Sequence, residues 1–130
     1  MVVDTSALIA LLVGEPEAGR CAEHLAANPA FSVSSFSVLE TSIVLSARKG
    51  PAATRELDLL LHRTQARVVP LTAELAESAR DAWEKFGKGR HPADLNIGDC
   101  CSYALSRSLG EPLLFKGNDF NHTDLETIAL

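Results

Sequence analysis

Two acidic residues of this sequence stand directly behind short apolar runs. Asp4 follows the run Met1–Val3, and Asp119 follows the run Leu113–Phe115 after three intervening residues. Both runs are typical of short buried strands, and parallel sheets bind ligands beyond the carboxyl ends of their strands. Asp4 also opens an Asp-Thr-Ser sequence in which every residue type is a good helix N-cap. A capping role and a ligand-binding role are therefore both open for Asp4.

Two further acids lie in segments with helical periodicity. Glu40 follows Phe36 by four residues and precedes Ile43 by three, which predicts that its carboxylate shares the apolar face of a helix. A charge on such a face needs a metal ion or a charged partner, and an ion pair with an arginine is the alternative explanation. Asp99 follows Asn96 by three residues, so the two side chains share a face, and a solvated surface acid is the alternative there.

Together the four acids predict a cluster that binds hard divalent cations. Two carboxylates 4 Å apart repel each other by roughly 4 kcal/mol at an effective dielectric constant near 20, so such a cluster stays ionised only around cations. Ligands that are all oxygen favour Mg²⁺ or Mn²⁺, and the four histidines show no zinc-ligand spacing with one another or with the three cysteines. A bound Mg²⁺ lowers the pKa of a water molecule and shields a phosphate, which makes phosphodiester hydrolysis the predicted chemistry.

The elements that must position these acids alternate along the chain. The expected strands are Met1–Val3, Phe31–Ser34, Arg67–Pro70 and Leu113–Phe115, with a fifth near Ala129 in a sheet of four to five strands. The expected helices are Thr5–Val13, Glu17–Ala27, Ser35–Arg48, Pro51–Thr64, Thr72–Phe86 and Leu95–Leu109. This α/β alternation predicts a parallel sheet covered by helices on both faces, in a single domain spanning residues 1–130.

The composition excludes several classes of protein. Hydrophobic residues make up 46% of the chain and charged residues 22%, which excludes general disorder. The net charge of −5 excludes a nucleic-acid binder held by bulk charge, so such a role would depend on local basic patches or on bound cations. Two basic segments, Arg48–Arg67 and Lys85–His91, each carry a net charge of +3.

The cysteines and the longest uncharged run indicate the compartment. Cys100 and Cys101 are adjacent and Cys21 is distant, so the odd set of three cysteines predicts free thiols in a reducing cytoplasm. The uncharged run Leu25–Leu39 contains Pro29 and is too short to span a bilayer. We therefore expect a cytoplasmic protein without a signal peptide and without contact with a membrane.

Four runs of the sequence resemble the motifs of PIN-domain nucleases, in particular the VapC-type toxins of bacterial toxin–antitoxin pairs. The runs are Val2–Leu8, Leu39–Thr41, Leu95–Cys100 and Leu113–Phe120, and they occur in the order and spacing of that family over nearly the whole chain. The resemblance implies a PIN-like three-layer α/β/α fold with a short parallel sheet. It also implies that Mg²⁺, replaceable by Mn²⁺, is bound at a catalytic site made of Asp4, Glu40, Asp99 and Asp119.

The same resemblance implies residues that support the metal ligands. The hydroxyl of the serine two positions after the first acid contacts that acid in the family. The supporting residues carried over in this way are Ser6, Asn96 and Asn118. The fourth acid of the family varies in position, so Asp94 and Asp124 are alternatives to Asp119.

The implied activity is that of an endoribonuclease toxin that hydrolyses RNA with metal-activated water and is neutralised by a cognate antitoxin. A homodimer and a hetero-oligomer with the antitoxin are also implied. The basic loop Gly87–His91 leads into the helix of Asp99, so Lys88 and Arg90 are the candidate RNA-binding residues, with an ordinary solvated loop as the alternative. The aliphatic side chains of the early helices exceed what a small sheet needs, and in the family such a surface receives the antitoxin.

Two other functions compete with this one. In a non-catalytic PIN-like binding module the acids would only hold the fold together, and no specific Mg²⁺ site would exist. An acid-pocket phosphotransfer protein is weakly indicated by Lys116, which follows a strand. The first strand ends in one acid and not in a pair, which argues against phosphotransfer.

Overall fold

A five-stranded parallel sheet forms the middle layer of the computed structural model, which describes residues 1–130. The strands are β1 (Val2–Val3), β2 (Ser32–Ser34), β3 (Arg67–Val69), β4 (Leu113–Phe115) and β5 (Thr127–Ala129). Their order across the sheet is β3-β2-β1-β4-β5, and each neighbouring pair is parallel. The expected parallel sheet is confirmed, and the C-terminal tail supplies the fifth strand.

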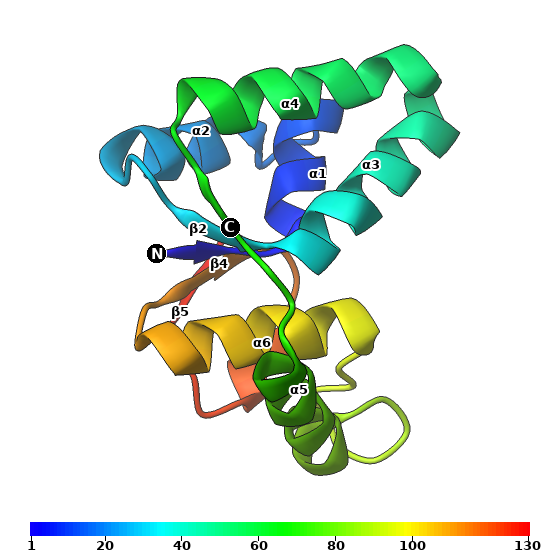
Figure 1. Cartoon of the computed structure of the whole chain (residues 1–130), viewed down its shortest axis with the longest axis vertical. Coiled ribbons are helices and arrows are strands. Elements are labelled where there is room, and N and C mark those ends of the chain that lie inside the picture. The colour runs from blue at the N-terminus through cyan, green and yellow to red at the C-terminus, as the bar shows by residue number, and fades with distance from the viewer.

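Helices cover both faces of this sheet. They are α1 (Thr5–Val13), α2 (Ala18–Ala27), α3 (Ser35–Lys49), α4 (Thr54–Arg63), α5 (Ala73–Phe86) and α6 (Ile97–Leu109), with short 3₁₀ turns η1 (Pro51–Ala53) and η2 (Asp119–His122). Figure 1 shows α1 to α4 on one side of the sheet and α5 with α6 on the other, which is the three-layer arrangement expected. None of the six helices is both long and apolar enough to cross a lipid bilayer.

The central strands are buried on both faces. Val2 packs into a core with residues of α5 and α6, whereas Val3 packs into a second core with α1 to α4. Leu113 and Leu114 divide between the same two cores in the same way. Side chains of successive strand residues point to opposite faces, so a strand between two helical layers needs a continuous apolar run. This explains why the sequence is an unbroken apolar run at Met1–Val3 and at Leu113–Phe115.

Helix α3 differs from the sequence prediction in the face that it buries. The predicted core face was a stripe of apolar residues that included Leu39 and Ile43, but the exposed fractions of these two side chains are 59% and 61%. The buried residues of α3 are Ser37, Thr41 and Leu45. The small side chains of Ser37 and Thr41 let α3 pack closely against its neighbours, and the Ser37 hydroxyl contacts a serine of α6. The apolar residues that looked like core therefore border an open surface.

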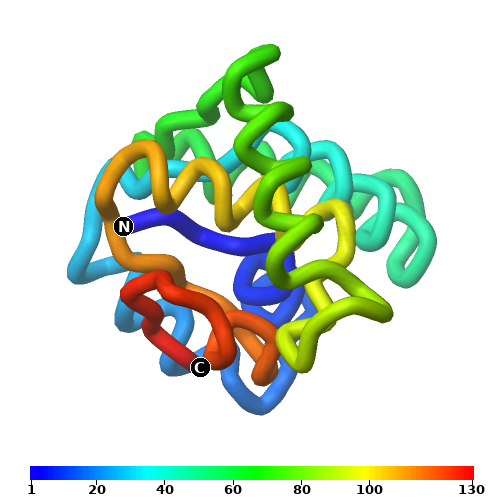
Figure 2. Tube along the Cα trace, turned by 90° about the horizontal axis from the view of Figure 1, so that it is seen from below, coloured from blue at the N-terminus to red at the C-terminus, as the bar shows by residue number.

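The sheet topology brings the ends of β1 and β4 together. The two strands are central neighbours, with Val3 in register with Leu114, and the Asp4 amide donates a hydrogen bond to the Leu114 carbonyl at 2.9 Å. Figure 2 views the chain from the side of α5 and α6 and shows α6 running along the first strand. The residues that follow β1 and β4 and those that begin α6 therefore meet at one edge of the sheet.

Candidate active site

Asp4 lies at the carboxyl end of β1 and is held by neutral hydrogen-bond donors. Its side chain is buried, and its Oδ2 atom accepts hydrogen bonds from the amide of Ser6 at 2.9 Å and from the Ser6 hydroxyl at 2.6 Å. Its Oδ1 atom accepts a hydrogen bond from the hydroxyl of Ser102 at 2.6 Å. Asp4 is the N-cap of α1, and no ion pair involves its carboxylate. Capping and a role in a charged site therefore coexist in one side chain.

The Ser6 hydroxyl also connects Asp4 to the segment that follows β4. It accepts a hydrogen bond from the Lys116 amide at 3.0 Å while donating its own proton to Asp4. The ammonium of Lys116 pairs with the carboxylates of Glu15 and Glu17, which raise its pKa. The positive charge of Lys116 is therefore engaged by those two acids, and the receiver-like role that the phosphotransfer alternative needs has no support in this geometry.

Asp99 lies in the first turn of α6 and is only 9% exposed, so it is not the solvated surface acid of the alternative reading. Its Oδ2 atom accepts a hydrogen bond from the Asn96 amide at 2.9 Å, and the Asn96 side-chain oxygen accepts one from the Asp99 amide at the same distance. This reciprocal capping box fixes where the carboxylate stands at the start of α6. Asn96 thus contacts the acid that it was expected to support.

The pKa of Asp99 is affected by the other three acids. Burial, with the negative charges of Asp4, Asp119 and Glu40, raises this pKa to about 7, against the lowering effect of the hydrogen bond from the Asn96 backbone. Like charges raise the pKa of a carboxyl group only when they lie near it. The four acids therefore share one electrostatic site although they come from four separate parts of the chain.

Glu40 reaches this site across the first turn of α6. A Cβ atom added to Gly98 would lie 2.6 Å from Glu40 Oε1 and 2.9 Å from Oε2, so the carboxylate rests on the bare backbone beside Asp99. Glu40 takes part in no ion pair, and an arginine partner therefore does not explain its position. The absence of a side chain at Gly98 is what lets α3 present this carboxylate to α6.

Asp119 begins η2 on the exposed side of the site. Partial burial raises its pKa, and so do the charges of Asp4 and Asp94. Asp94 is itself exposed, and its Oδ1 atom accepts a hydrogen bond from the Gly89 amide at 3.0 Å. Asp94 therefore lies close enough to Asp119 to repel it while also closing its own loop.

Asp124 and Asn118 are placed differently from the other candidates. The Asp124 carboxylate accepts hydrogen bonds from the Tyr103 hydroxyl at 2.6 Å and from Arg107 at 3.1 Å, and these partners lower its pKa. Asn118 is exposed, and its side-chain oxygen contacts Asn121 at 3.4 Å. No hydrogen bond connects either residue to the other acids of the site, so neither has a contact through which to support them.

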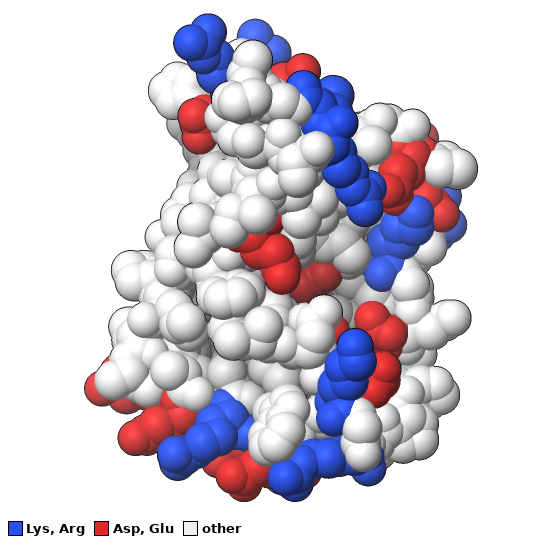
Figure 3. All heavy atoms as spheres, turned by 90° about the vertical axis from the view of Figure 1, so that its right-hand side faces the viewer, with Lys and Arg blue, Asp and Glu red and all other residues white.

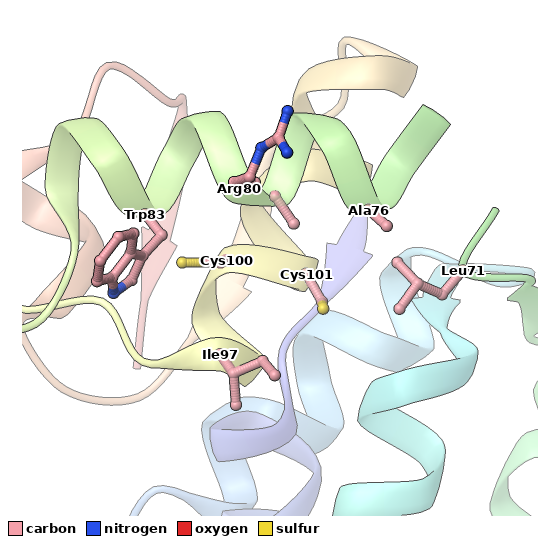
Figure 4. Close-up of a pocket in the computed structure, with 8 residues that line it drawn as sticks. Leu71, Ala76, Arg80, Trp83, Ile97, Cys100 and Cys101 are labelled. Atoms are coloured by element: carbon pink, nitrogen blue, oxygen red, sulfur yellow. The ribbon is translucent and has the colours of Figure 1, made fainter. Parts of the chain in front are cut away.

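The surface around the acids is hollowed and mixed in character. Figure 3 shows acidic atoms gathered in a depression near the middle of one face, with Lys and Arg side chains above and below and uncharged atoms beside them. An apolar groove of about 400 Å³ lies between α5 and the start of α6, and Figure 4 shows side chains from both helices lining it. The exposed residues Trp83 and Ile97 belong to this groove.

The loop between α5 and α6 is closed by its own hydrogen bonds. The Lys88 amide donates to the Leu95 carbonyl at 2.9 Å, and the Leu95 amide donates to the Phe86 carbonyl at 3.0 Å. The Arg90 guanidinium lies 4.2 Å from the ring centre of Trp83, a cation–π contact. Lys88 and Arg90 are both exposed, so the hydrogen-bonded loop presents their charges to solvent.

The chemistry of the donor set fits a hard divalent cation. Three carboxylates without a cationic partner, those of Asp4, Glu40 and Asp119, act on the buried Asp99, whose pKa is raised to about 7, and a bound cation would relieve that repulsion. In the arrangement described, no three acidic, histidine or cysteine side chains stand close enough together to hold an ion. The acids match a divalent cation in charge and in ligand type. To bind it, their side chains would have to move closer together around the ion.

The thiols beside the acids are neutral. Burial is the main cause that raises the pKa of Cys100 to about 12 and that of Cys101 to about 11, with smaller contributions from Asp99 and Glu40 respectively. All three cysteines are free, as expected. Sequence reasoning missed Ser102 and Gly98, because neither a serine inside a helix nor a glycine in its first turn follows a recognisable spacing to the acids.

Comparisons with known proteins give the PIN domain, VapC proteins and a toxin-antitoxin complex. A family model described as the PIN domain matches residues 1–126. The chain is 51% identical over 130 residues to Ribonuclease VapC30 of Mycobacterium tuberculosis, and the alignment covers 100% of this chain and 99% of that protein. The crystal structure of Mycobacterium tuberculosis VapC20, described as a Sarcin-Ricin loop cleaving toxin, aligns with a TM-score of 0.79 at 26% identity over 95% of both chains. A toxin-antitoxin complex from Klebsiella pneumoniae aligns with a TM-score of 0.73 at 20% identity, over 98% of this chain and 94% of that one.

Proposed function

The chain belongs to the PIN-domain family, and we propose that it is a metal-dependent endoribonuclease that serves as the toxin of a toxin–antitoxin pair. The observation that carries this proposal is the single electrostatic site formed by Asp4, Glu40, Asp99 and Asp119 at the ends of β1 and β4 without any cationic partner. A relative that is 51% identical over the whole chain is named a ribonuclease, which supports RNA as the substrate class.

The proposed cofactor is Mg²⁺, which Mn²⁺ can replace. Asp4, Glu40, Asp99 and Asp119 would hold it, and when bound it supplies a water molecule of lowered pKa and positive charge beside the scissile phosphate. The residues of the chain fix the ligands. Ser6 and Ser102 hold the Asp4 carboxylate, and the capping box of α6 holds that of Asp99.

The attacking group in this proposal is water and not a side chain. The thiols of Cys100 and Cys101 are buried, and their raised pKa values keep them protonated at neutral pH. The hydroxyl of Ser6 donates a hydrogen bond to the Asp4 carboxylate, and so does the hydroxyl of Ser102. These hydroxyl groups are therefore used to orient a carboxylate.

The loop Gly87–His91 is the proposed contact for the RNA backbone. Replacing Lys88 and Arg90 together by glutamine should weaken RNA binding and lower the slope of log K against log salt by about 1.4, at about 0.7 per lost phosphate contact on a single strand. Binding of Mn²⁺ should not change, because neither side chain can ligate a cation. Fluorescence anisotropy with a labelled RNA at several salt concentrations measures the slope.

The matched control for this loop removes the same charge from the opposite layer. Arg55 and Arg63 are exposed residues of α4, and their joint replacement by glutamine should leave the slope near that of the unchanged protein. Equal slopes for the Lys88/Arg90 variant and the unchanged protein would remove the loop from the path of the RNA. The basic segment Arg48–Arg67 would then be the remaining candidate.

The proposed partner is a cognate antitoxin. The similarity in fold to a protein from a toxin-antitoxin complex supports a separate inhibitory chain. A cationic side chain of that partner, inserted among the acids, would take the place of the metal charge and block the phosphate. The sequence predicted spare apolar surface on α1, α2 and α4 for an amphipathic antitoxin helix, but Leu8, Leu25 and Leu57 of these helices are buried in the core, so the structure does not support that location. The homodimer implied by the family remains a prediction.

RNA cleavage by the purified chain tests the proposed function directly. We expect cleavage of an RNA substrate in Mg²⁺ and in Mn²⁺, none in EDTA, and recovery when the metal is restored. Co-expression with the product of the adjacent small gene should relieve growth arrest and give a stable complex. A chain that cleaves no RNA in either metal and is harmless when overproduced would favour the binding-module alternative.

A further inference from the structure

Hydroxyl groups from two different helices hold Asp4. Ser6 belongs to α1, the helix that Asp4 caps, and its contacts with Oδ2 are local in sequence. Ser102 belongs to α6, and its hydroxyl donates to Oδ1 at 2.6 Å across 98 positions of the chain. Ser102 is 1% exposed and Asp4 is 2% exposed, so water does not compete for this contact. The helix that carries Asp99 therefore also fixes the first acid.

The hydrogen bonds of Asp4 leave one acceptor position free. An ionised carboxylate offers about four acceptor positions, two on each oxygen. Oδ2 accepts two hydrogen bonds, from the amide and from the hydroxyl of Ser6. Oδ1 accepts one, from Ser102. The remaining position is on Oδ1, the oxygen that Ser102 controls.

A second buried serine fixes the direction of the Ser102 hydroxyl. Ser37 of α3 is fully buried, and its Oγ atom lies 3.3 Å from Ser102 Oγ. Ser102 has one hydroxyl proton and donates it to Asp4, so Ser37 must be the donor in the contact between the two serines. The result is a series of hydrogen bonds donated from Ser37 to Ser102 and from Ser102 to Asp4, which joins α3, α6 and the end of β1.

We propose that Ser102 is a positioning residue for the metal site, and that it leaves the free acceptor position on Asp4 Oδ1 for the cation. This inference rests on the proposed function, since the cation is the same one. Without Ser102, Asp4 keeps both contacts with Ser6 on Oδ2, but nothing fixes Oδ1. The carboxylate then samples other orientations, so the affinity for the cation falls without being lost.

The experiment measures the affinity for Mn²⁺ of RNA-free protein by titration calorimetry. Ser102→Ala should weaken this affinity by about 10-fold to 100-fold, the range found when an outer partner of a metal ligand is removed. The matched control is Ser106→Ala. Ser106 lies one turn later in α6, is 2% exposed, and donates its hydroxyl to the Glu111 carbonyl at 2.6 Å, away from the acids. The affinity for Mn²⁺ of this control should equal that of the unchanged protein.

Two more variants separate positioning from a general effect on folding. Ser102→Thr retains the hydroxyl and should restore most of the lost affinity, whereas Ser37→Ala should give a smaller loss than Ser102→Ala. Unfolding midpoints measured beside each titration show whether α6 is intact. The positioning role is overturned if Ser102→Ala binds Mn²⁺ as the unchanged protein does, or if Ser102→Ala and Ser106→Ala weaken binding equally. An unchanged protein that binds no Mn²⁺ would overturn the proposed cofactor as well.

Discussion

Replacing Asp4 by asparagine is expected to lower the rate of RNA cleavage by more than about 100-fold while the fold stays intact. Loss of an outer partner of a metal ligand costs about 10-fold to 100-fold, and Asp4→Asn removes a ligand together with its charge. Asparagine is as good an N-cap as aspartate, so the start of α1 should persist. Cleavage rates at saturating Mg²⁺, with circular dichroism of the same samples, measure both parts of the prediction.

The same substitution at Asp124 is the matched control for Asp4→Asn. The Asp124 carboxylate is bound by Tyr103 and Arg107 and has no contact with the other acids. Asp124→Asn should therefore cleave RNA at close to the rate of the unchanged protein. Full activity of Asp4→Asn in Mg²⁺ would show that the ends of β1 and β4 do not form the catalytic site.

The sequence predicts the central strands well because they are buried on both faces. A continuous apolar run bounded by turn residues has few alternative structures, and β4 was predicted with the bounds that the structure gives. Helix α1 was also predicted with its observed bounds, since Asp4 marks its start and Gly14 its end, where a φ of +77° favours glycine. The position of Asp4 behind β1 followed from the same reasoning.

Contacts between distant helices were beyond the reach of sequence patterns. Periodicity identifies two faces of α3, but only the packing shows that Ser37 and Leu45 are covered while Ile43 is open. Glu40 lies on the predicted apolar face, yet it is only partly buried, and its carboxylate lies against the start of α6 at Gly98. The contact of Ser102 with Asp4 depends on a crossing of α6 over β1 that no spacing in the sequence encodes.

Removing the charge of Asp99 is expected to stabilise the metal-free protein at pH 8. Burial and the neighbouring acids raise the pKa of Asp99 from 3.8 to about 7 in the folded state. A raised pKa means that the folded state favours the protonated acid, so its contribution to stability is complete below pH 3.8 and is lost as the pH rises through 7. Asp99→Asn has no such loss. Its free energy of unfolding should exceed that of the unchanged protein by up to about 4 kcal/mol at pH 8, at 1.36 kcal/mol per pKa unit.

The difference between the two proteins should shrink as the pH falls from 8 towards 4, because Asp99 then becomes protonated in both folded and unfolded chains. Urea unfolding in EDTA at several pH values measures this difference, and Asp81→Asn, which changes an exposed acid of α5, should shift stability by no more than about 0.5 kcal/mol. Added Mn²⁺ should narrow the difference at pH 8, since a ligand at 100 times its Kd stabilises the protein that binds it by about 2.7 kcal/mol and Asp99→Asn lacks a ligand. A difference that stays constant from pH 4 to pH 8 would contradict the strained acid cluster. Such a result would mean that Asp99 is ionised at little cost in the folded chain, and that the four acids do not need a cation to coexist.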